Sequence, residues 1–376
     1  MTHTYKIVVL PGDGVGREVV PETVKVLKAA RDTVTGFDFD FVEFPCGGKY
    51  YLESGKEWPD EAWETCKKSD AILFGAVGYP SAVKPNGSLA GIDILLDLRF
   101  GLDLYANLRP AKLYKGIESR ILGKGPKDVD FMVVRENTEG LYVPIRGMLS
   151  RGGTDELAVD VRVITRKGAE RIIRYAFELC MKRNGAPADG KKRVTCVDKS
   201  NVLDGCRFFR KIYDEIAASY GNVQRDYVYV DAMTQWMIRA PEHYDVVVTS
   251  NFQGDILSDL SSVLIGGMGM APSANIGERY GFFEPVHGSA PDIAGQSKAN
   301  PIGSILSGKM MLEWLAQKHG DRACEKAAAK IEEAVSRVLS EEKIRTPDLC
   351  YGNYSGVTPS TTSEVGDAIV EKIEKK

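Results

Sequence analysis

The sequence lacks the features that mark membrane, secreted and nucleic-acid-binding proteins. None of its apolar runs approaches the roughly 20 residues that are needed to cross a bilayer. No secretion signal precedes the first apolar segment. The net charge is only −3, and no basic block alternates with aromatic residues. We therefore expect a soluble, cytoplasmic protein whose partners are neither membranes nor nucleic acids.

Cysteine and histidine patterns that would bind zinc are also missing. The seven cysteines are scattered and form no CxxC pair, which is typical of reduced thiols in a cytoplasm-like compartment. The four histidines never lie two or four residues apart. Any metal site must therefore use oxygen ligands.

What is present is the pattern of an α/β protein. The chain exceeds the size at which one core usually stops growing, so two lobes are expected, and no flexible linker separates them. Short β-branched runs alternate with amphipathic stretches, as in a parallel or mixed sheet flanked by helices. The predicted strands are 6–10, 71–74, 131–134, 193–197, 227–230 and 244–249, and the predicted helices are 18–30, 167–182, 208–218, 305–317, 322–340 and 364–373.

Two segments stand apart from this pattern. Residues 155–164 alternate apolar and polar side chains, which predicts an antiparallel strand outside the main sheet, of the kind used as a dimerisation arm. Residues 11–17 form a glycine-rich turn between a strand and a helix. Because its glycines stand at 12, 14 and 16, it does not match the G-x-G-x-x-G fingerprint. Two interpretations of residues 11–17 stay open: a flexible turn, or a loop that lines the cofactor site.

Asp255 and Asp259 are four residues apart, so on a helix both carboxylates project from one face. Like charges at this spacing destabilise a helix unless a cation offsets them, which favours a divalent metal site. The alternative is an ordinary solvated acidic face. Asp231 follows the strand 227–230 directly and is a third candidate ligand, with a helix cap as its alternative.

Basic and hydroxyl side chains provide the candidates for substrate binding and proton transfer. Arg99, Arg109 and Arg135 are bracketed by apolar residues, and guanidinium groups match carboxylates bidentately. Structural salt bridges are the alternative for each. Lys199 and Tyr142 are a candidate base and acid, and singly each also fits a surface lysine and a packing tyrosine.

A loop of small residues, 287–295, precedes the helix 305–317. The backbone can approach a ligand closely there, and Asp292 is suited to bind a ribose while repelling a 2′-phosphate. A loop without function is the alternative.

Seven ordered motifs resemble one family along nearly the whole chain. They are GDGVGREV, LR…ANLRP, VRENTEG-Y, DK-NVL, VDAM, NFQGDILSDL and EPVHGSAPDIAG…ANP. Together they resemble the isocitrate/isopropylmalate, or β-decarboxylating, dehydrogenase family, and within it most closely the 3-isopropylmalate dehydrogenases.

The resemblance implies a two-domain α/β fold that is distinct from the Rossmann fold. Residues 1–104 and 266–376 would form a large domain on the cofactor side. Residues 105–265 would form a small domain that carries the metal ligands, the dimer interface and the arm. The resemblance also implies a homodimer with shared active sites.

By the same resemblance, Asp255 and Asp259 of one chain and Asp231 of the other hold Mg²⁺ or Mn²⁺. Lys199 removes the hydroxyl proton and Tyr142 returns a proton after CO₂ has left. Arg99, Arg109 and Arg135 bind the carboxylates of a 2-hydroxy dicarboxylate or tricarboxylate.

The implied cofactor is NAD, because Asp292 stands where NAD-linked relatives carry an acidic residue, although Lys298 nearby is a contrary signal. The other implied cofactor-binding residues are Glu284, His287, Gly288, Ser289, Ala290 and Asn300.

Leu95, Leu96 and Val202 match the apolar substrate pocket of isopropylmalate enzymes, which predicts 3-isopropylmalate as substrate and a role in leucine biosynthesis. Ile92 departs from that branch, so D-malate, tartrate, isocitrate and homoisocitrate stay open as alternatives. A non-catalytic regulatory subunit of an isocitrate dehydrogenase is the alternative of another class.

Overall fold

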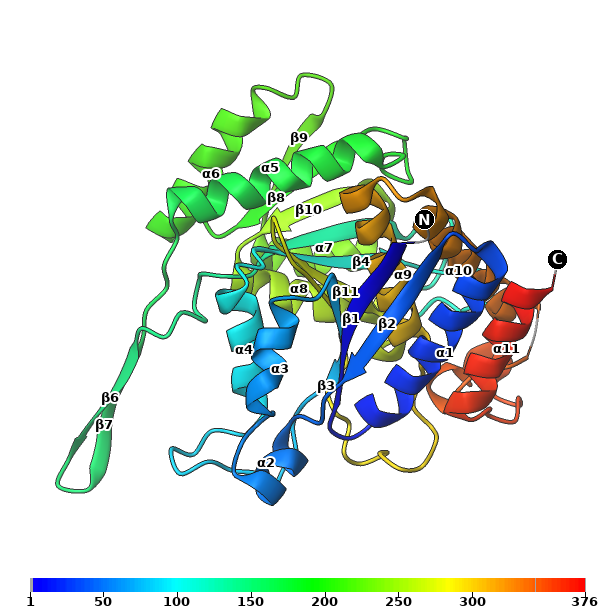
Figure 1. The fold of residues 1–376 in the computed structure, drawn as a ribbon. Coiled ribbons are helices and arrows are strands. Elements are labelled where there is room, and N and C mark those ends of the chain that lie inside the picture. The colour runs from blue at the N-terminus through cyan, green and yellow to red at the C-terminus, as the bar shows by residue number, and fades with distance from the viewer. Residues whose placement is uncertain (1–2, 342, 376) are drawn as a thin grey trace. The chain divides into compact units, whose positions relative to one another are not determined.

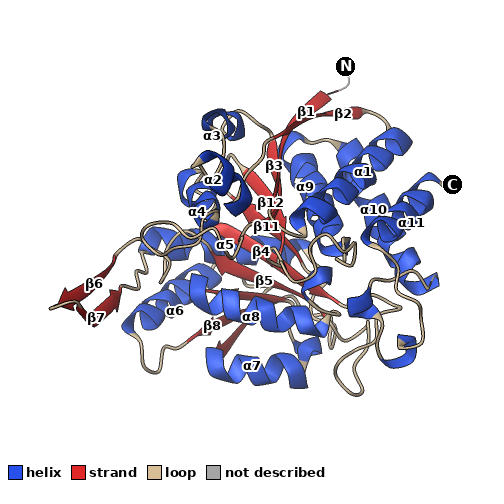
Figure 2. Ribbon diagram, turned by 90° about the horizontal axis from the view of Figure 1, so that it is seen from below, coloured by secondary structure: helices blue, strands red, loops and turns tan. Residues whose placement is uncertain are grey.

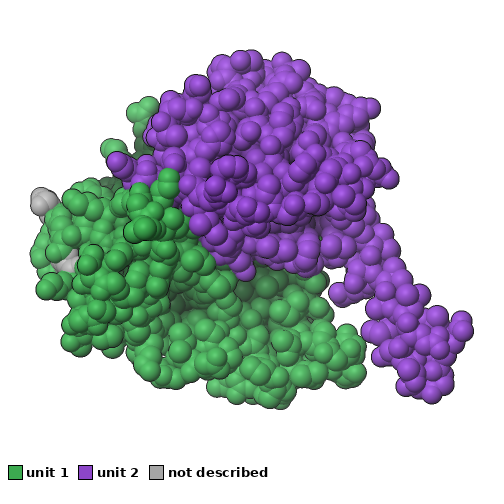
Figure 3. All heavy atoms as spheres, turned by 180° about the vertical axis from the view of Figure 1, so that it is seen from behind, with its two compact units in different colours: residues 1–104, 112–126, 262–376 green, residues 105–111, 127–261 purple. Residues whose placement is uncertain are grey.

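The computed structural model describes residues 3–341 and 343–375, which divide into two compact units (Figure 3). Unit 1 comprises Met1–Leu104, Lys112–Pro126 and Ser262–Lys376, and unit 2 comprises Tyr105–Ala111 and Lys127–Ser261. Both ends of the chain thus belong to unit 1. The predicted domain boundaries differ from these units mainly at Lys112–Pro126, and they stay a prediction.

The strands of unit 1 follow the order β2-β1-β3-β12-β11. β1 pairs in parallel with both β2 and β3, β3 pairs in parallel with β12, and β12 pairs antiparallel with β11. The sheet of this unit is therefore mixed. The bounds are β1 His3–Gly12, β2 Phe37–Glu43, β3 Ala71–Ala76, β11 Pro272–Ile276 and β12 Gly281–Pro285.

Helices cover both faces of these strands (Figures 1 and 2). On one face lie α1 (Gly16–Val34) and α9 (Ile302–His319), with α10 (Arg322–Glu341) and α11 (Thr362–Glu374) packed against them. On the other face lie α3 (Asp60–Cys66) and α4 (Ile92–Gly101), and α2 (Gly48–Ser54) precedes them in the chain.

The core between β1, β3, β12 and the α3–α4 pair is apolar and contains aromatic side chains. Phe74 and Phe282 pack edge to face with ring centroids 5.2 Å apart. Ile94 and Leu98, one turn apart on α4, are buried against them. Burial of each such side chain contributes about 1.5–3 kcal/mol, so this layer holds α4 and its Arg99 in place.

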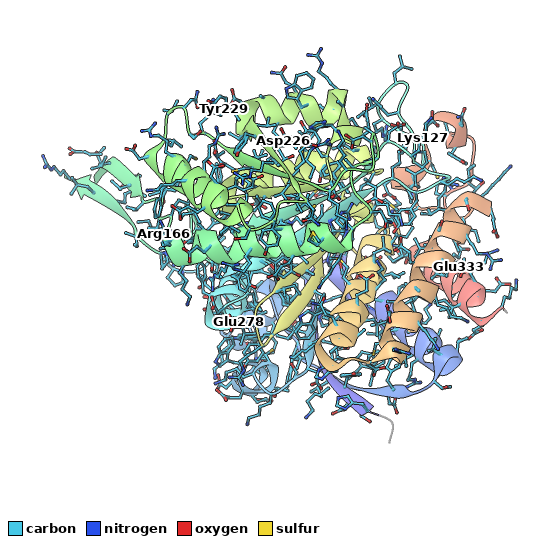
Figure 4. The ribbon with its side chains drawn as sticks, turned by 90° about the horizontal axis from the view of Figure 1, so that it is seen from above. Lys127, Arg166, Asp226, Tyr229, Glu278 and Glu333 are labelled. Carbon is cyan, nitrogen blue, oxygen red and sulfur yellow. The ribbon has the colours of Figure 1, made fainter. Side chains whose placement is uncertain are left out.

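The strands of unit 2 follow the order β4-β5-β10-β8-β9, with β10 parallel to β5 and β8, and β8 parallel to β9. Their bounds are β4 Ala106–Lys112, β5 Asp130–Glu136, β8 Arg193–Asp198, β9 Gln224–Tyr229 and β10 Val246–Thr249. Asp226 and Tyr229, both labelled in Figure 4, lie on the edge strand β9. The helices are α5 Arg166–Lys182, α6 Asp204–Ala217, α7 Val230–Arg239 and α8 Asn251–Leu264.

A two-stranded hairpin projects from the body of unit 2 (Figure 1). It is formed by β6 (Arg146–Arg151) and β7 (Thr154–Asp160), which pair antiparallel, and all its strand residues are exposed. The predicted antiparallel strand outside the main sheet is confirmed. Its use as a dimerisation arm stays a prediction.

The predicted α/β class with a mixed sheet flanked by helices is confirmed. Three predicted strand ends are wrong: the strand 155–164 ends at Asp160 in β7, the strand 244–249 begins only at Val246 in β10, and Val230 begins α7 instead of ending β9. Asp231 therefore stands in the first turn of a helix. Within the described residues, none of the helices is long and apolar enough to cross a membrane.

Candidate active site

Asp255 and Asp259 lie on α8, which begins two residues after β10 ends. Leu257 between them is fully buried, whereas both carboxylates remain partly exposed on the helix face. Both aspartates also meet arginines of neighbouring strands. The pair is therefore not a plain solvated acidic face.

Arg109 on β4 and Arg135 on β5 converge on these carboxylates. Arg109 Nη1 lies 3.4 Å from Asp255 Oδ1 and 3.3 Å from Asp259 Oδ1. Arg135 Nη1 also donates to Asp255 Oδ1. Both guanidinium groups are almost completely buried, so each needs charged or polar partners.

Small residues of α8 allow this close approach. A Cβ on Gly254 would lie 2.8 Å from Cβ and Cγ of Arg135, so only glycine lets the arginine stem lie against the helix. Ser258, buried between the two aspartates in the sequence, accepts a 2.6 Å hydrogen bond from Arg109 Nη1. Neither residue was predicted from the sequence.

Tyr142 joins the same cluster. Its hydroxyl donates a 2.7 Å hydrogen bond to Asp255 Oδ2. Its ring packs edge to face on Phe252 and lies 5.6 Å from the Arg135 guanidinium carbon. The structure thus brings together five predicted residues, which we call the α8 cluster: Arg109, Arg135, Tyr142, Asp255 and Asp259.

Lys199 and Asp231 form a separate pair, with Lys199 Nζ 2.6 Å from Asp231 Oδ1. Lys199 follows β8, where the buried Asp198 accepts a bidentate pair of hydrogen bonds from Arg210 and fixes the end of the strand. In the described part of the chain, no three His, Cys, Asp or Glu side chains group closely enough to hold a metal ion. One chain thus groups only two of the three predicted ligands.

Asp259 and Asp231 have opposite pKa shifts. Burial raises the pKa of Asp259, and Asp255 opposes its ionisation further, while Arg109 and Arg135 act in the other direction. The hydrogen bond from Lys199 lowers the pKa of the exposed Asp231. Asp231 is therefore a carboxylate at neutral pH, as a hard-metal ligand must be.

Two buried glutamates, absent from the sequence prediction, shape the loop between Arg135 and Tyr142. The Glu136 carboxylate accepts hydrogen bonds from the backbone nitrogens of Thr138 and Glu139 at 2.7 and 3.0 Å. The Glu139 carboxylate accepts from the backbone and hydroxyl of Thr165, the N-cap of α5. Burial raises the pKa of Glu136 to about 7.

In unit 1, the third predicted arginine is paired. Arg99 Nη2 lies 2.8 Å from Glu284 Oε1, which also accepts a hydrogen bond from Asn275. Glu284, expected to contact the cofactor, is thus nearly buried and engaged by two side chains. A structural salt bridge was the alternative role of Arg99 expected from the sequence, and such a salt bridge is present.

The glycine-rich turn of residues 12–16 packs against the loop that follows β12. Val15 N donates to Ser289 O at 2.8 Å, and a Cβ on Gly14 would lie 2.0 Å from that same oxygen. Gly14 also has a φ of +54°. The buried Asp13 carboxylate accepts from three backbone nitrogens, those of Gly48, Lys49 and Gly78. These contacts account for a tight glycine turn, and a cofactor-lining role stays a prediction.

The remaining predicted cofactor residues lie on the same loop or just after it. Gly288 and Asp292 are exposed, Ala290 has a φ of +40°, and the Ser289 hydroxyl donates to Gly78 O at 2.6 Å. His287 Nε2 is buried and has no hydrogen-bond partner in the described residues, and burial lowers the pKa of this histidine. Asn300 is buried and donates to Asp348. Their role in cofactor binding stays a prediction.

The predicted apolar substrate residues lie in different places. Leu95 and Leu96 are half-buried on α4, and Leu95 packs against the core of unit 1. Val202, in unit 2, has a largely exposed side chain. Their role in substrate binding stays a prediction.

The arrangement in unit 2 supplies three chemical functions. Two carboxylates on one helix face offer hard oxygen ligands to a divalent cation. Two guanidinium groups beside them are suited to bind carboxylates, and a tyrosine hydroxyl lies within reach of the same point. The amine of Lys199 pairs with Asp231 and is a candidate base.

Comparison with known proteins agrees with this geometry. Residues 6–369 match the family model described as isocitrate/isopropylmalate dehydrogenase. A 3-isopropylmalate/3-methylmalate dehydrogenase of Methanocaldococcus jannaschii is 42% identical over 99% of this chain and 100% of its own. A probable tartrate dehydrogenase/decarboxylase of Bacillus subtilis is also 42% identical, over 99% of this chain and 98% of its own.

Solved structures give the same result. Isocitrate dehydrogenase from Methylococcus capsulatus superposes with a TM-score of 0.85 at 36% identity and covers 99% of this chain and 100% of its own. The family resemblance read from the seven motifs is confirmed. The chain belongs to the isocitrate/isopropylmalate dehydrogenase family.

Proposed function

We propose that this protein catalyses the metal-dependent, NAD-linked oxidative decarboxylation of a 2-hydroxy acid, with 3-isopropylmalate as its substrate in leucine biosynthesis. The observation that carries the proposal is the α8 cluster, in which two arginines and a tyrosine converge on Asp255 and Asp259. Family membership supports the reaction class.

The α8 cluster fits Mg²⁺ or Mn²⁺, because its ligands are carboxylates and hard divalent cations prefer oxygen. Asp255 and Asp259 would hold the ion together with Asp231 of a second copy of this chain. A homodimer with shared active sites agrees with the finding that, among the residues described, Asp231 pairs with Lys199 and groups with no two further ligands.

Charge balance supports a dicarboxylate substrate. Arg109 and Arg135 offset Asp255 and Asp259, and Lys199 offsets Asp231, so the six side chains sum to zero. A divalent cation then leaves two positive charges, which a dianionic hydroxy acid neutralises. A tricarboxylate such as isocitrate would leave one negative charge in excess.

Each side chain has a distinct task in the proposed reaction. Lys199 binds as an ammonium and must first release its own proton to solvent, and its neutral amine then accepts the proton of the substrate hydroxyl. Arg109 and Arg135 orient the carboxylates, and Tyr142 delivers a proton to the carbon that loses CO₂. A bound divalent cation supplies charge that favours loss of the hydroxyl proton and of CO₂, and NAD⁺ supplies the hydride acceptor. Arg99, Leu95, Leu96 and Val202 complete the substrate contacts by family resemblance.

For the cofactor, the exposed Asp292 supports NAD, since a carboxylate binds ribose hydroxyls and repels a 2′-phosphate. His287, Gly288, Ser289, Ala290 and Asn300 are the proposed companions, whereas we propose that Glu284 acts through its salt-bridge partner Arg99. All seven cysteines are free thiols, which agrees with the reducing cytoplasm that we propose as the location.

Tartrate is the second candidate substrate, because the Bacillus subtilis relative is as similar to this chain as the Methanocaldococcus jannaschii relative is. Its two hydroxyls would need polar partners where isopropylmalate needs apolar ones. By family resemblance, tartrate relatives also carry a Leu-Leu pair, and an apolar pocket does not strongly reject an added hydroxyl, so Leu95 and Leu96 do not separate the two substrates.

The test is an assay of NAD⁺ reduction by the purified chain with Mg²⁺, against isopropylmalate, D-malate, tartrate, isocitrate and homoisocitrate. The proposal predicts the highest kcat/KM with isopropylmalate, and a preference for NAD⁺ over NADP⁺. Activity without any partner chain excludes a regulatory subunit. Absence of turnover with all five acids would overturn the proposal.

A further inference from the structure

The buried side chain of Asn251 connects the two halves of the α8 cluster. Asn251 is the first residue of α8 and is only 2% exposed. Its Oδ1 accepts hydrogen bonds from Arg135 Nε at 3.0 Å and Nη2 at 2.7 Å. Its Nδ2 donates to the backbone oxygen of Glu139 at 2.9 Å.

The chemistry of the partners fixes the orientation of this amide. A guanidinium can only donate hydrogen bonds, and a carbonyl oxygen can only accept them. If the amide were turned over, its NH₂ group would face Arg135 and its oxygen would face the Glu139 carbonyl. The Asn251 oxygen therefore accepts from Arg135, its nitrogen donates to Glu139, and the two groups cannot exchange places.

Toward Arg135, the amide oxygen holds two of the three guanidinium nitrogens. The third, Nη1, donates to Asp255 on the open side of the cluster. Arg135 is only 1% exposed, so replacement of Asn251 would remove a buried acceptor that orients its Nε and Nη2. The amide thus selects the edge of Arg135 that faces the aspartates.

The amide does this without a charge of its own. A carboxylate at position 251 would add a second negative charge beside Arg135, which already pairs with Asp255, and this charge would repel a bound carboxylate, whereas the neutral amide oxygen adds none. The choice of asparagine over aspartate therefore has a consequence for binding and not only for folding.

Toward Glu139, the amide fixes the loop that carries Tyr142. Gly140 exchanges backbone hydrogen bonds with Val163, at 2.9 and 3.1 Å, and the Glu139 carboxylate binds Thr165. The bond from Asn251 ties this loop directly to the first turn of α8, whose Asp255 accepts from Tyr142.

We infer that Asn251 is a positioning residue: its neutral amide aims the Arg135 guanidinium at the substrate carboxylate and holds the Tyr142 loop against the helix that carries Asp255. The inference rests on the proposed function. It assigns to Asn251 an effect on hydroxy-acid binding that acts through Arg135, and an effect on turnover that acts through Tyr142.

The test compares Asn251→Asp and Asn251→Leu with the wild type and with Gln253→Leu. Gln253 is a matched control, because it is a buried amide in the same turn of α8 that bonds Thr249 and Ser250. The measurements are KM for the hydroxy acid and for NAD⁺, kcat, the dissociation constant of the hydroxy acid from calorimetry without NAD⁺, and Tm.

Asn251→Asp keeps the acceptor for the buried arginine but places a carboxylate oxygen opposite the Glu139 carbonyl, so its Tm and its kcat are both expected to fall. Its KM and dissociation constant for the hydroxy acid should rise about tenfold or more, with KM for NAD⁺ unchanged. Asn251→Leu should lose about 100-fold or more in kcat/KM, since both bonds are lost. Gln253→Leu should stay within about threefold of the wild type.

Unchanged hydroxy-acid binding by Asn251→Asp would overturn the inference, as would a loss in Gln253→Leu equal to that in Asn251→Leu. A wild-type enzyme that oxidises no hydroxy acid would instead overturn the proposed function, and the inference with it. The two failures are thus distinguished by the activity of the wild type alone.

Discussion

The hydroxyl of Tyr142 donates a 2.7 Å hydrogen bond to Oδ2 of Asp255, so the proposed proton donor and the proposed metal ligand are in direct contact. The other oxygen of Asp255 accepts from Arg135. Asp255 therefore orients the acid and a substrate-binding arginine at once, and their separate contributions can be measured by substitution.

Tyr142→Phe removes the proposed proton donor and keeps the ring on Phe252. We expect kcat to fall about 10²–10⁴-fold, the range for loss of a general acid, with KM for the hydroxy acid nearly unchanged. The affinity for Mn²⁺, measured by calorimetry, should stay within about threefold, because both aspartates remain. Full turnover by this variant would remove Tyr142 from the mechanism.

Glu284→Gln removes the charge that neutralises Arg99. Because Glu284 Oε1 is already occupied by Arg99 and Asn275, we expect KM for the hydroxy acid to rise more than KM for NAD⁺. Steady-state kinetics with each substrate varied in turn would show the difference. Glu278→Gln, at an exposed glutamate labelled in Figure 4, is the control. A rise confined to NAD⁺ would instead support the cofactor contact expected from the sequence.

Gly14→Ala places a Cβ 2.0 Å from Ser289 O on a backbone with a φ of +54°. We expect a loss of about 1–3 kcal/mol in the free energy of unfolding and a raised KM for NAD⁺, because the Ser289 loop must shift. Denaturant unfolding and kinetics measure the two effects. Gly356→Ala, where nothing lies within 4 Å, should change neither. Normal NAD⁺ binding by a destabilised Gly14→Ala would show that the turn is structural only.

Glu136 gives a prediction for stability against pH. Burial raises its pKa to about 7, above the value of about 4.5 expected in the unfolded chain. A raised carboxyl pKa contributes stability that is fully present below the unfolded value and is lost as pH rises through the folded value. The contribution, up to about 3 kcal/mol, should therefore disappear between about pH 4.5 and pH 7.

The measurement is urea unfolding of wild type and Glu136→Gln across that pH range. The difference in the free energy of unfolding between the two proteins should favour the wild type most at the acidic end and shrink toward neutral pH. Groups that do not interact with Glu136 titrate equally in both proteins, so the comparison reports Glu136 together with its coupled neighbour Glu139. A difference that is constant with pH would contradict the assignment.

The sequence predicted well what depends on local pattern. The β-branched run 131–134 lies inside β5, and the spacing of Asp255 and Asp259 correctly placed both on one helical face. The end of β9 was mispredicted because Val230 and Asp231 follow apolar strand residues without a glycine or proline to mark the boundary. Here the fold, and not local propensity, sets where the helix begins.

What the sequence did not predict are contacts between distant residues. Asn251 and Arg135 are 116 positions apart, and no local signal marks an asparagine at a helix start as the partner of a strand arginine. The same holds for Ser258 with Arg109 and for Gly254, whose missing side chain admits the Arg135 stem. Such residues are found only when tertiary packing is known.

The central claim is that two chains complete one active site, with Lys199 and Asp231 of one serving the α8 cluster of the other. The most direct test mixes two inactive variants, Lys199→Ala and Asp255→Asn, under conditions that exchange subunits. Each hybrid dimer would hold one site with both defects and one intact site, so random mixing should restore about a quarter of the wild-type activity.

The matched control mixes Lys199→Ala with Asp231→Asn. Each site takes Lys199 and Asp231 from the same chain, so every site of a hybrid dimer carries one of the two defects. We expect that mixture to remain inactive. Recovery in the first mixture and not in the second would establish the shared site. An inactive first mixture, with hybrid dimers shown to be present, would contradict it.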